Sequence, residues 1–236
     1  MNAAMPTPLA DLPPGLVWRA DSFAHVTEKT WPTGYAALDA ELPGGGWPGG
    51  AITELLADTP GIGSIELLLP MLRRAPVERW IAWVAPPCLP YAPALADAGL
   101  ALSQLILIDP PQHSALVWAT RQATASGACH AVMAWVHKID MAALRRLQLA
   151  AEASATPLFL YRPLAAASQP SPACLRLQLT PEENAIGISI LKRRGPASAR
   201  TLHLPLRKRY PARNPHALDS PDTARPALAS LHARRG

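Results

Sequence analysis

Short apolar runs alternate with helical stretches between residues 51 and 161. Consecutive apolar residues in each run are typical of parallel strands that are buried on both faces. Helices between successive strands are the connections that parallel pairing requires. The order therefore predicts an α/β fold with a mostly parallel sheet. The expected strands are 51–56, 79–85, 104–108, 131–136 and 157–161, and the expected helices are 63–74, 91–99, 113–126 and 142–153.

The alternation of strands and helices ends after residue 161. Three further strand-like segments, 175–179, 186–193 and 200–206, follow one another with no helical stretch between them. Turn-forming residues separate these segments, at Pro181–Asn184 and at Gly195-Pro196. Neighbouring strands joined by short turns pair antiparallel. We therefore expect an antiparallel meander at the C-terminal edge of the sheet.

The segments on either side of this core have a different composition. Residues 1–32 are punctuated by prolines and have little periodicity, which predicts an extended N-terminal arm. A short helix over 33–42, with Thr33 as its N-cap, and a glycine-rich turn over 43–50 should open the core. The domain boundaries we expect are an arm over 1–32, a core over 33–206 and a basic tail without fixed structure over 207–236.

The positive charge is concentrated at the C-terminal end. The chain carries 22 basic and 17 acidic side chains, a net charge of +5. Residues 1–183 sum to −4, whereas residues 184–236 sum to +9. Such asymmetry indicates DNA or an acidic protein surface as a partner, although a solvated edge that keeps the sheet from aggregating is the alternative. The candidate binding residues are Lys192, Arg193, Arg194, Arg200, Arg207, Lys208, Arg209 and Arg213.

Several classes of protein are not indicated. No apolar stretch approaches the ~20 residues that span a bilayer, and the N-terminus lacks the pattern of a secretory signal. Cys88, Cys129 and Cys174 are odd in number and far apart, which fits neither a disulfide framework nor a zinc site. His130 and His137 have no third ligand nearby in sequence. We therefore expect a cytoplasmic protein with no metal, no cofactor and no membrane contact.

Isolated polar and aromatic residues also have alternative readings. Glu54 is a lone charge within an apolar strand, which favours an edge position or a paired carboxylate over catalysis. Asp109 follows a strand, where it either ligates magnesium or begins an Asp-Pro-Pro turn. Trp80, Trp83 and Trp135 are predicted to be core residues rather than a platform for stacking bases.

The loop after the first strand, Glu54–Ser64, has the strand–loop–helix setting of a phosphate-binding loop. The approach to it resembles a known family. The segment Thr33–Asp39, the turn Trp47–Gly50 and Ile52–Glu54 resemble the approach to the ATPase core of RecA. Together with the arm and the basic C-terminus, they look most like the ImuA family, over roughly residues 30–206. This resemblance implies a RecA-like three-layer α/β/α fold with a C-terminal antiparallel edge.

The catalytic residues of RecA do not carry over in this register. Gly63 stands where the phosphate-binding lysine is expected. Trp135-Val136 replaces the magnesium carboxylate, and Pro86-Pro87 replaces the glutamate that activates water. We therefore expect a degenerate ATPase core that is not an enzyme, and a true ATPase with displaced groups is the alternative. Otherwise the loop is a turn into a helix capped by Ser64. The residues of the degenerate phosphate loop are Ala57, Gly61, Gly63 and Ser64.

The resemblance also implies a function. It is that of a non-catalytic accessory factor in SOS-induced translesion DNA synthesis, associated with the nucleoid when active. Such a factor would link ImuB to the error-prone C-family DNA polymerase at damaged DNA, with RecA and non-specific DNA as further partners. The alternative is a SulA-like SOS inhibitor of cell division, which shares the fold and lacks the same catalytic residues. The long basic tail argues against that alternative.

Overall fold

The computed structural model describes residues 29–59, 61–196 and 200–206. The predicted arm lies outside the described residues up to residue 28, and the predicted tail over 207–236 lies outside them altogether. The domain boundaries therefore stay predictions. The same holds for part of the basic set, because four of its members are outside the described residues: Arg207, Lys208, Arg209 and Arg213.

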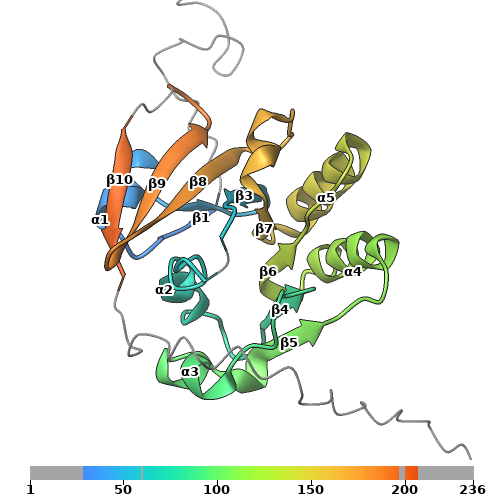
Figure 1. Ribbon diagram of the computed structural model, residues 1–236. Helices are drawn as coiled ribbons and strands as arrows, with labels where there is room; N and C mark the ends of the chain where they lie inside the picture. Colours follow the sequence, from blue (N-terminus) through green and yellow to red (C-terminus); the bar gives the residue numbers. More distant parts are fainter. Residues whose placement is uncertain (1–28, 60, 197–199, 207–236) are drawn as a thin grey trace, which may run out of the picture. The chain divides into compact units, whose positions relative to one another are not determined.

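One eight-stranded sheet organises the described chain, in the order β10-β9-β8-β3-β7-β6-β4-β5 (Figure 1). The six strands from β8 to β5 in this order pair parallel, whereas β9 and β10 add an antiparallel edge. The predicted mostly parallel sheet of a mixed α/β fold is thus confirmed. The strands are β3 (Ile52–Leu56), β4 (Trp80–Val84), β5 (Leu105–Ile108), β6 (Cys129–Trp135), β7 (Leu158–Arg162), β8 (Leu175–Glu182), β9 (Ala185–Lys192) and β10 (Thr201–Pro205).

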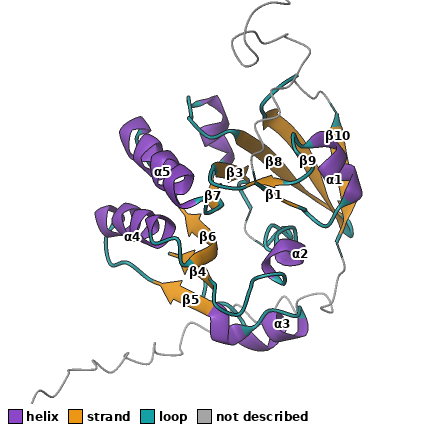
Figure 2. Cartoon of the chain, turned by 180° about the vertical axis from the view of Figure 1, so that it is seen from behind, coloured by secondary structure: helices purple, strands orange, loops and turns teal. Residues whose placement is uncertain are grey.

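Helices cover both faces of the sheet, with α4 and α5 together on one side and α2 and α3 on the other (Figure 2). The sheet has a separate hydrophobic core on each of its faces, because successive side chains of a strand point to opposite faces. Ile81 and Trp83 pack with residues of α1, α2 and α3, whereas Ala82 and Val84 pack with residues of α4 and α5. The helices are α1 (Ala36–Glu41), α2 (Leu69–Leu72), α3 (Ala92–Asp97), α4 (His113–Ala125) and α5 (Met141–Ser154), with 3-10 turns η2 (Leu102–Gln104) and η3 (Leu164–Ser168).

The helix predicted over 63–74 is wrong over most of its length. Only Leu69–Leu72 is α-helical, and residues 61–68 form turns. Gly61 and Gly63 have positive φ angles, and Pro70 has no N–H with which to bond the carbonyl of the preceding turn. The prediction that Ser64 caps this helix is also wrong, since the residue before α2 is Leu68 and no side chain caps the helix.

The start of the core differs from the sequence prediction in two further details. Helix α1 begins at Ala36 without a side-chain cap, and the Thr33 hydroxyl instead accepts a hydrogen bond from the Tyr35 N–H at 3.1 Å. The glycine-rich turn was not expected to contain a strand, yet β2 (Trp47–Pro48) pairs with β1 (Thr30–Trp31). The two-residue pairing is possible because Trp47 is fully buried and anchors the segment in the core. Within the described residues, no helix is long and apolar enough to cross a membrane.

Candidate functional site

A buried ion cluster joins three neighbouring strands of the parallel part of the sheet. Glu54 on β3 is fully buried, and its carboxylate accepts hydrogen bonds from Arg162 on β7 at 2.8 Å and from Arg176 on β8 at 2.6 Å. The Ser171 hydroxyl donates to the same carboxylate at 2.8 Å. Of the alternatives for Glu54, the paired carboxylate is confirmed. The cluster ties three strands together.

The loop predicted to be a degenerate phosphate loop lies against protein atoms. A Cβ added to Gly63 would overlap the side chain of Leu206, which therefore covers the loop at this point. The Tyr161 hydroxyl donates to the carbonyl of Ser64 at 3.3 Å. The Ala57 N–H donates to the backbone carbonyl of Arg162 at 3.1 Å. Gly61 is exposed and has nothing within 4 Å of an added Cβ.

Aromatic side chains fill the space beside this loop. The Trp135 ring stacks on Tyr161 with a centroid separation of 4.5 Å and an interplanar angle of 5°. Trp83 meets the edge of Trp135 at 5.7 Å, so these three rings form one packed group. Trp83 is a core residue, as predicted. The part of the chain that the structure describes contains no group of three or more metal-ligating side chains.

The described basic residues make contacts within the chain. Lys192 Nζ donates to the carbonyl of Ser171 at 2.8 Å, and Arg193 forms an ion pair with Glu41 at 3.0 Å. Arg194 and Arg200 are exposed beyond the end of β9 and before β10. Their role in binding a partner stays a prediction.

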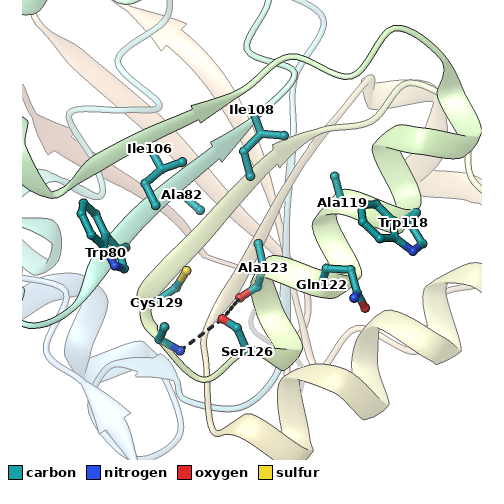
Figure 3. A pocket seen from close by; sticks show the side chains of 11 residues that line it. Trp80, Ala82, Ile106, Ile108, Trp118, Ala119, Gln122, Ala123, Ser126 and Cys129 are labelled. Carbon is teal, nitrogen blue, oxygen red and sulfur yellow. Dashed lines mark hydrogen bonds between the residues drawn. The ribbon is translucent and has the colours of Figure 1, made fainter. Parts of the chain in front are cut away.

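A different feature was missed by the sequence analysis. An open apolar groove of about 280 Å³ lies between α4 and the strands β4, β5 and β6 (Figure 3). Two indoles flank it, Trp80 from β4 and Trp118 from α4. Trp80 is 43% exposed and Trp118 is 62% exposed. The prediction that Trp80 is a core residue is therefore wrong. The remaining lining residues are Ala82, Ile106, Ile108, Ala119, Gln122, Ala123, Ser126, Ala128 and Cys129.

The groove follows from small residues at the centre of this layer. Ala119 and Ala123 of α4 face the strands four residues apart, and Ala82 lies opposite on β4. Methyl groups leave the space between the two indoles unfilled. The groove is open because β5 is the last strand of the sheet and has no neighbour beyond it among the described residues.

The groove has the chemistry of a binding surface rather than of a catalytic centre. The polar side chains that line it are Gln122 and Ser126, and neither is an acid or a base at neutral pH. Burial raises the pKa of the Cys129 thiol, so the thiolate that would act as a nucleophile is disfavoured. One sequence signal was available for the groove. Trp118 lies on the same helix face as Ser114 and Arg121. This face is polar, and a tryptophan is unusual on the polar face of an amphipathic helix.

Comparison with known proteins finds similarity over this region of the chain. The model of a family described as cell division inhibitor SulA matches residues 50–157. The comparisons point to SulA. The cell division inhibitor SulA of Pseudomonas aeruginosa is 31% identical over 106 residues, 43% of this chain and 65% of the relative. The SulA of Photorhabdus laumondii is 32% identical over 99 residues, 42% of this chain and 56% of the relative.

The matches to SulA cover less than half of this chain. The chain spans less than two thirds of the length of these two relatives. The crystal structure of SulA from Pseudomonas aeruginosa is 25% identical, with a TM-score of 0.40, and covers 47% of this chain and 97% of that one. The segment matched by the SulA family model runs from the residue pair before β3 to the residue before β7, and it contains every residue that lines the groove.

These findings correct the resemblance to ImuA. The family model and both relatives are SulA, so the predicted role in translesion synthesis is wrong, and with it the partners ImuB, C-family polymerase, RecA and DNA. Most of the residues that carried the resemblance, in Thr33–Gly50, lie before or at the start of the matched segment. SulA is described as an inhibitor, which agrees with a protein that is not an enzyme. Nothing in these comparisons supports a degenerate ATPase or a phosphate-binding loop.

Proposed function

We propose that this chain is a SulA-like inhibitor of cell division, which binds a cytoskeletal division protein and performs no chemistry. The observation that carries the proposal is the match of the SulA family model to residues 50–157. We further propose that the groove between Trp80 and Trp118 is the surface that contacts the target. Every residue lining this groove lies within the matched segment.

The physical character of the groove supports this role. Burying the exposed parts of both indoles would remove on the order of 200 Å² of apolar surface from water, which corresponds to about 5 kcal/mol. Tryptophans in apolar surroundings are frequent hot spots of protein interfaces, where one truncation costs about 2 kcal/mol or more. A target side chain that enters the groove would contact Ile106 and Ile108 on its floor.

The setting of the protein follows from the same proposal. A SulA-like inhibitor would act in the SOS response and in the cytoplasm, where its target assembles, and association with the nucleoid stays a prediction. The basic tail argued against this function in the sequence, but residues 207–236 lie outside the matched segment. The tail therefore does not bear on whether the core is SulA-like. Parallel pairing and helices on both faces support a RecA-like three-layer core, which we also retain as a proposal.

Induced expression in growing bacteria tests the function. We expect the wild-type chain to produce filamentous cells, because division stops while growth continues. Trp118→Ala should abolish filamentation at equal protein level. The matched control is Leu149→Ala on α5, since Leu149 is 64% exposed and does not line the groove. Normal cell length with the wild-type chain would refute the proposed function, and equal filamentation by Trp118→Ala would refute the groove as its surface.

A further inference from the structure

The edge of the sheet beside the groove suggests how a target is held. We propose that β5 accepts an extended segment of the target as an additional strand, with alternate side chains of that segment entering the groove between Trp80 and Trp118. This inference rests on the proposed function and adds the conformation of the bound target segment. The occupant we propose is an extended segment of the division protein.

The backbone of β5 has hydrogen-bonding groups that point away from the sheet. The Ile108 carbonyl accepts a hydrogen bond from Ala85 N–H at 2.8 Å, so the polar backbone groups of Ile108 and Ile106 face β4. Backbone groups alternate in direction along a strand, so those of Leu105 and Leu107 face outward. The Leu105 N–H is already bonded to the carbonyl of Leu102. Within the described residues, the Leu107 N–H has no backbone partner.

β5 is short, at four residues, but its sequence carries none of the charges or prolines that block strand addition at other edges. Natural edge strands are commonly blocked by charged residues, proline or a bulge. β5 reads Leu-Ile-Leu-Ile, with no charge and no proline, and it pairs with β4 in unbroken register. Leu107 is 41% exposed. The first protecting residues, Asp109 and Pro110, come only after the strand has ended. An edge of this kind is a template for another strand.

The groove supplies the side-chain specificity that strand addition needs. An added strand would lie about 4.8 Å beyond β5, and every second side chain would point to the face covered by α4. Ile106 and Ile108 line the groove on that same face. A large apolar side chain on the added strand would therefore reach the space beside Trp118. Main-chain bonds supply affinity in such complexes, and pockets for alternate side chains supply selectivity.

Charge indicates the composition of the segment that binds. Arg121 neighbours the groove residues Trp118 and Gln122 on α4, and Arg79 precedes Trp80, so two exposed arginines mark the end of the groove where β5 begins. Glu78 offsets one of these charges. The net positive end favours a target segment that carries apolar residues at alternate positions and an acidic residue at one end.

Leu107→Pro tests strand pairing. Proline removes the outward N–H and is tolerated on edge strands, because the lost donor does not bond within the sheet. The matched control is Leu107→Thr, which shortens the same side chain and keeps the N–H. With purified division protein as the probe, we expect Leu107→Pro to bind about tenfold more weakly than Leu107→Thr, since the hydrogen bond donated by the Leu107 N–H is lost. Thermal unfolding of both variants should match the wild type.

Hydrogen exchange on the wild-type chain provides a second measurement that does not depend on a variant. The Leu107 amide should exchange rapidly in the free chain and at least tenfold more slowly in the complex. Equal binding by the two variants, or unchanged exchange at Leu107, would overturn strand pairing. If Trp118→Ala still abolished filamentation, the proposed function would survive that result. A wild-type dimer that Leu107→Pro converts to a monomer would also overturn the inference, because a second copy would then occupy the edge.

Discussion

Replacing Glu54 with glutamine should destabilise the fold far more than an ordinary charge substitution. Glu54 is fully buried and joins Arg162 at 2.8 Å to Arg176 at 2.6 Å. Glutamine keeps the shape of the side chain but removes the negative charge, so two guanidinium groups stay buried without a counter-charge. Breaking a buried ion pair by removing one partner costs about 3–5 kcal/mol. In a domain of this size, each kcal/mol lowers the melting temperature by about 2–4 °C.

The expected fall in melting temperature is thus on the order of 10 °C. Chemical denaturation of the purified chain measures the change in unfolding free energy directly. Glu41→Gln is the matched control, because Glu41 pairs with Arg193 at 3.0 Å near the surface. That variant should lose no more than about 1 kcal/mol. A loss below about 1 kcal/mol for Glu54→Gln would refute the reasoning, since the two arginines would then be neutralised by other means.

Two further predictions follow from buried titratable groups. The pKa of the Cys174 thiol is raised to about 11, mainly by burial, so it is almost entirely protonated at pH 8. Iodoacetamide should therefore label the exposed Cys88 well before Cys174, as peptide mass spectrometry would report, and equal rates would contradict the packing. Burial lowers the pKa of His130 below 6.5, so the unfolded chain binds the proton more readily. Stability should fall as the pH drops below about 6.5, and His130→Gln should weaken this pH dependence of the unfolding free energy.

The order and type of most elements could be predicted from the sequence. Apolar runs such as Ala131–Val136 lie in the sheet interior, because a strand flanked by other strands and covered by helices is buried on both faces. Errors occurred where single residues interrupt the backbone pattern. Pro70 and the positive φ of Gly63 shortened the helix expected over 63–74, since both act on hydrogen bonds or backbone angles rather than on hydrophobic periodicity.

The predicted resemblance to ImuA was wrong for a related reason. The motifs that resembled ImuA are turn and helix-start residues such as Trp47-Pro48 and Thr33-Gly34, which set backbone geometry. Proteins that share a fold share such residues whether or not they share a function. The match over residues 50–157 extends through several strands and helices, so it discriminates between families where the short motifs do not.

Tertiary structure alone decided the candidate site. Trp80 lies in an apolar run that reads as core, but it is exposed because it begins β4 and has no partner on β5, whose first residue pairs with Ile81. Strand order depends on the path of the whole chain, which local sequence does not encode. The partners of Glu54 come from 108 and 122 residues away for the same reason. The sequence by itself determined which segments are apolar enough to enter the sheet, because local hydrophobicity indicates this. Only the tertiary structure determined which of these segments lies at an edge and is partly exposed, because that depends on contacts between distant segments.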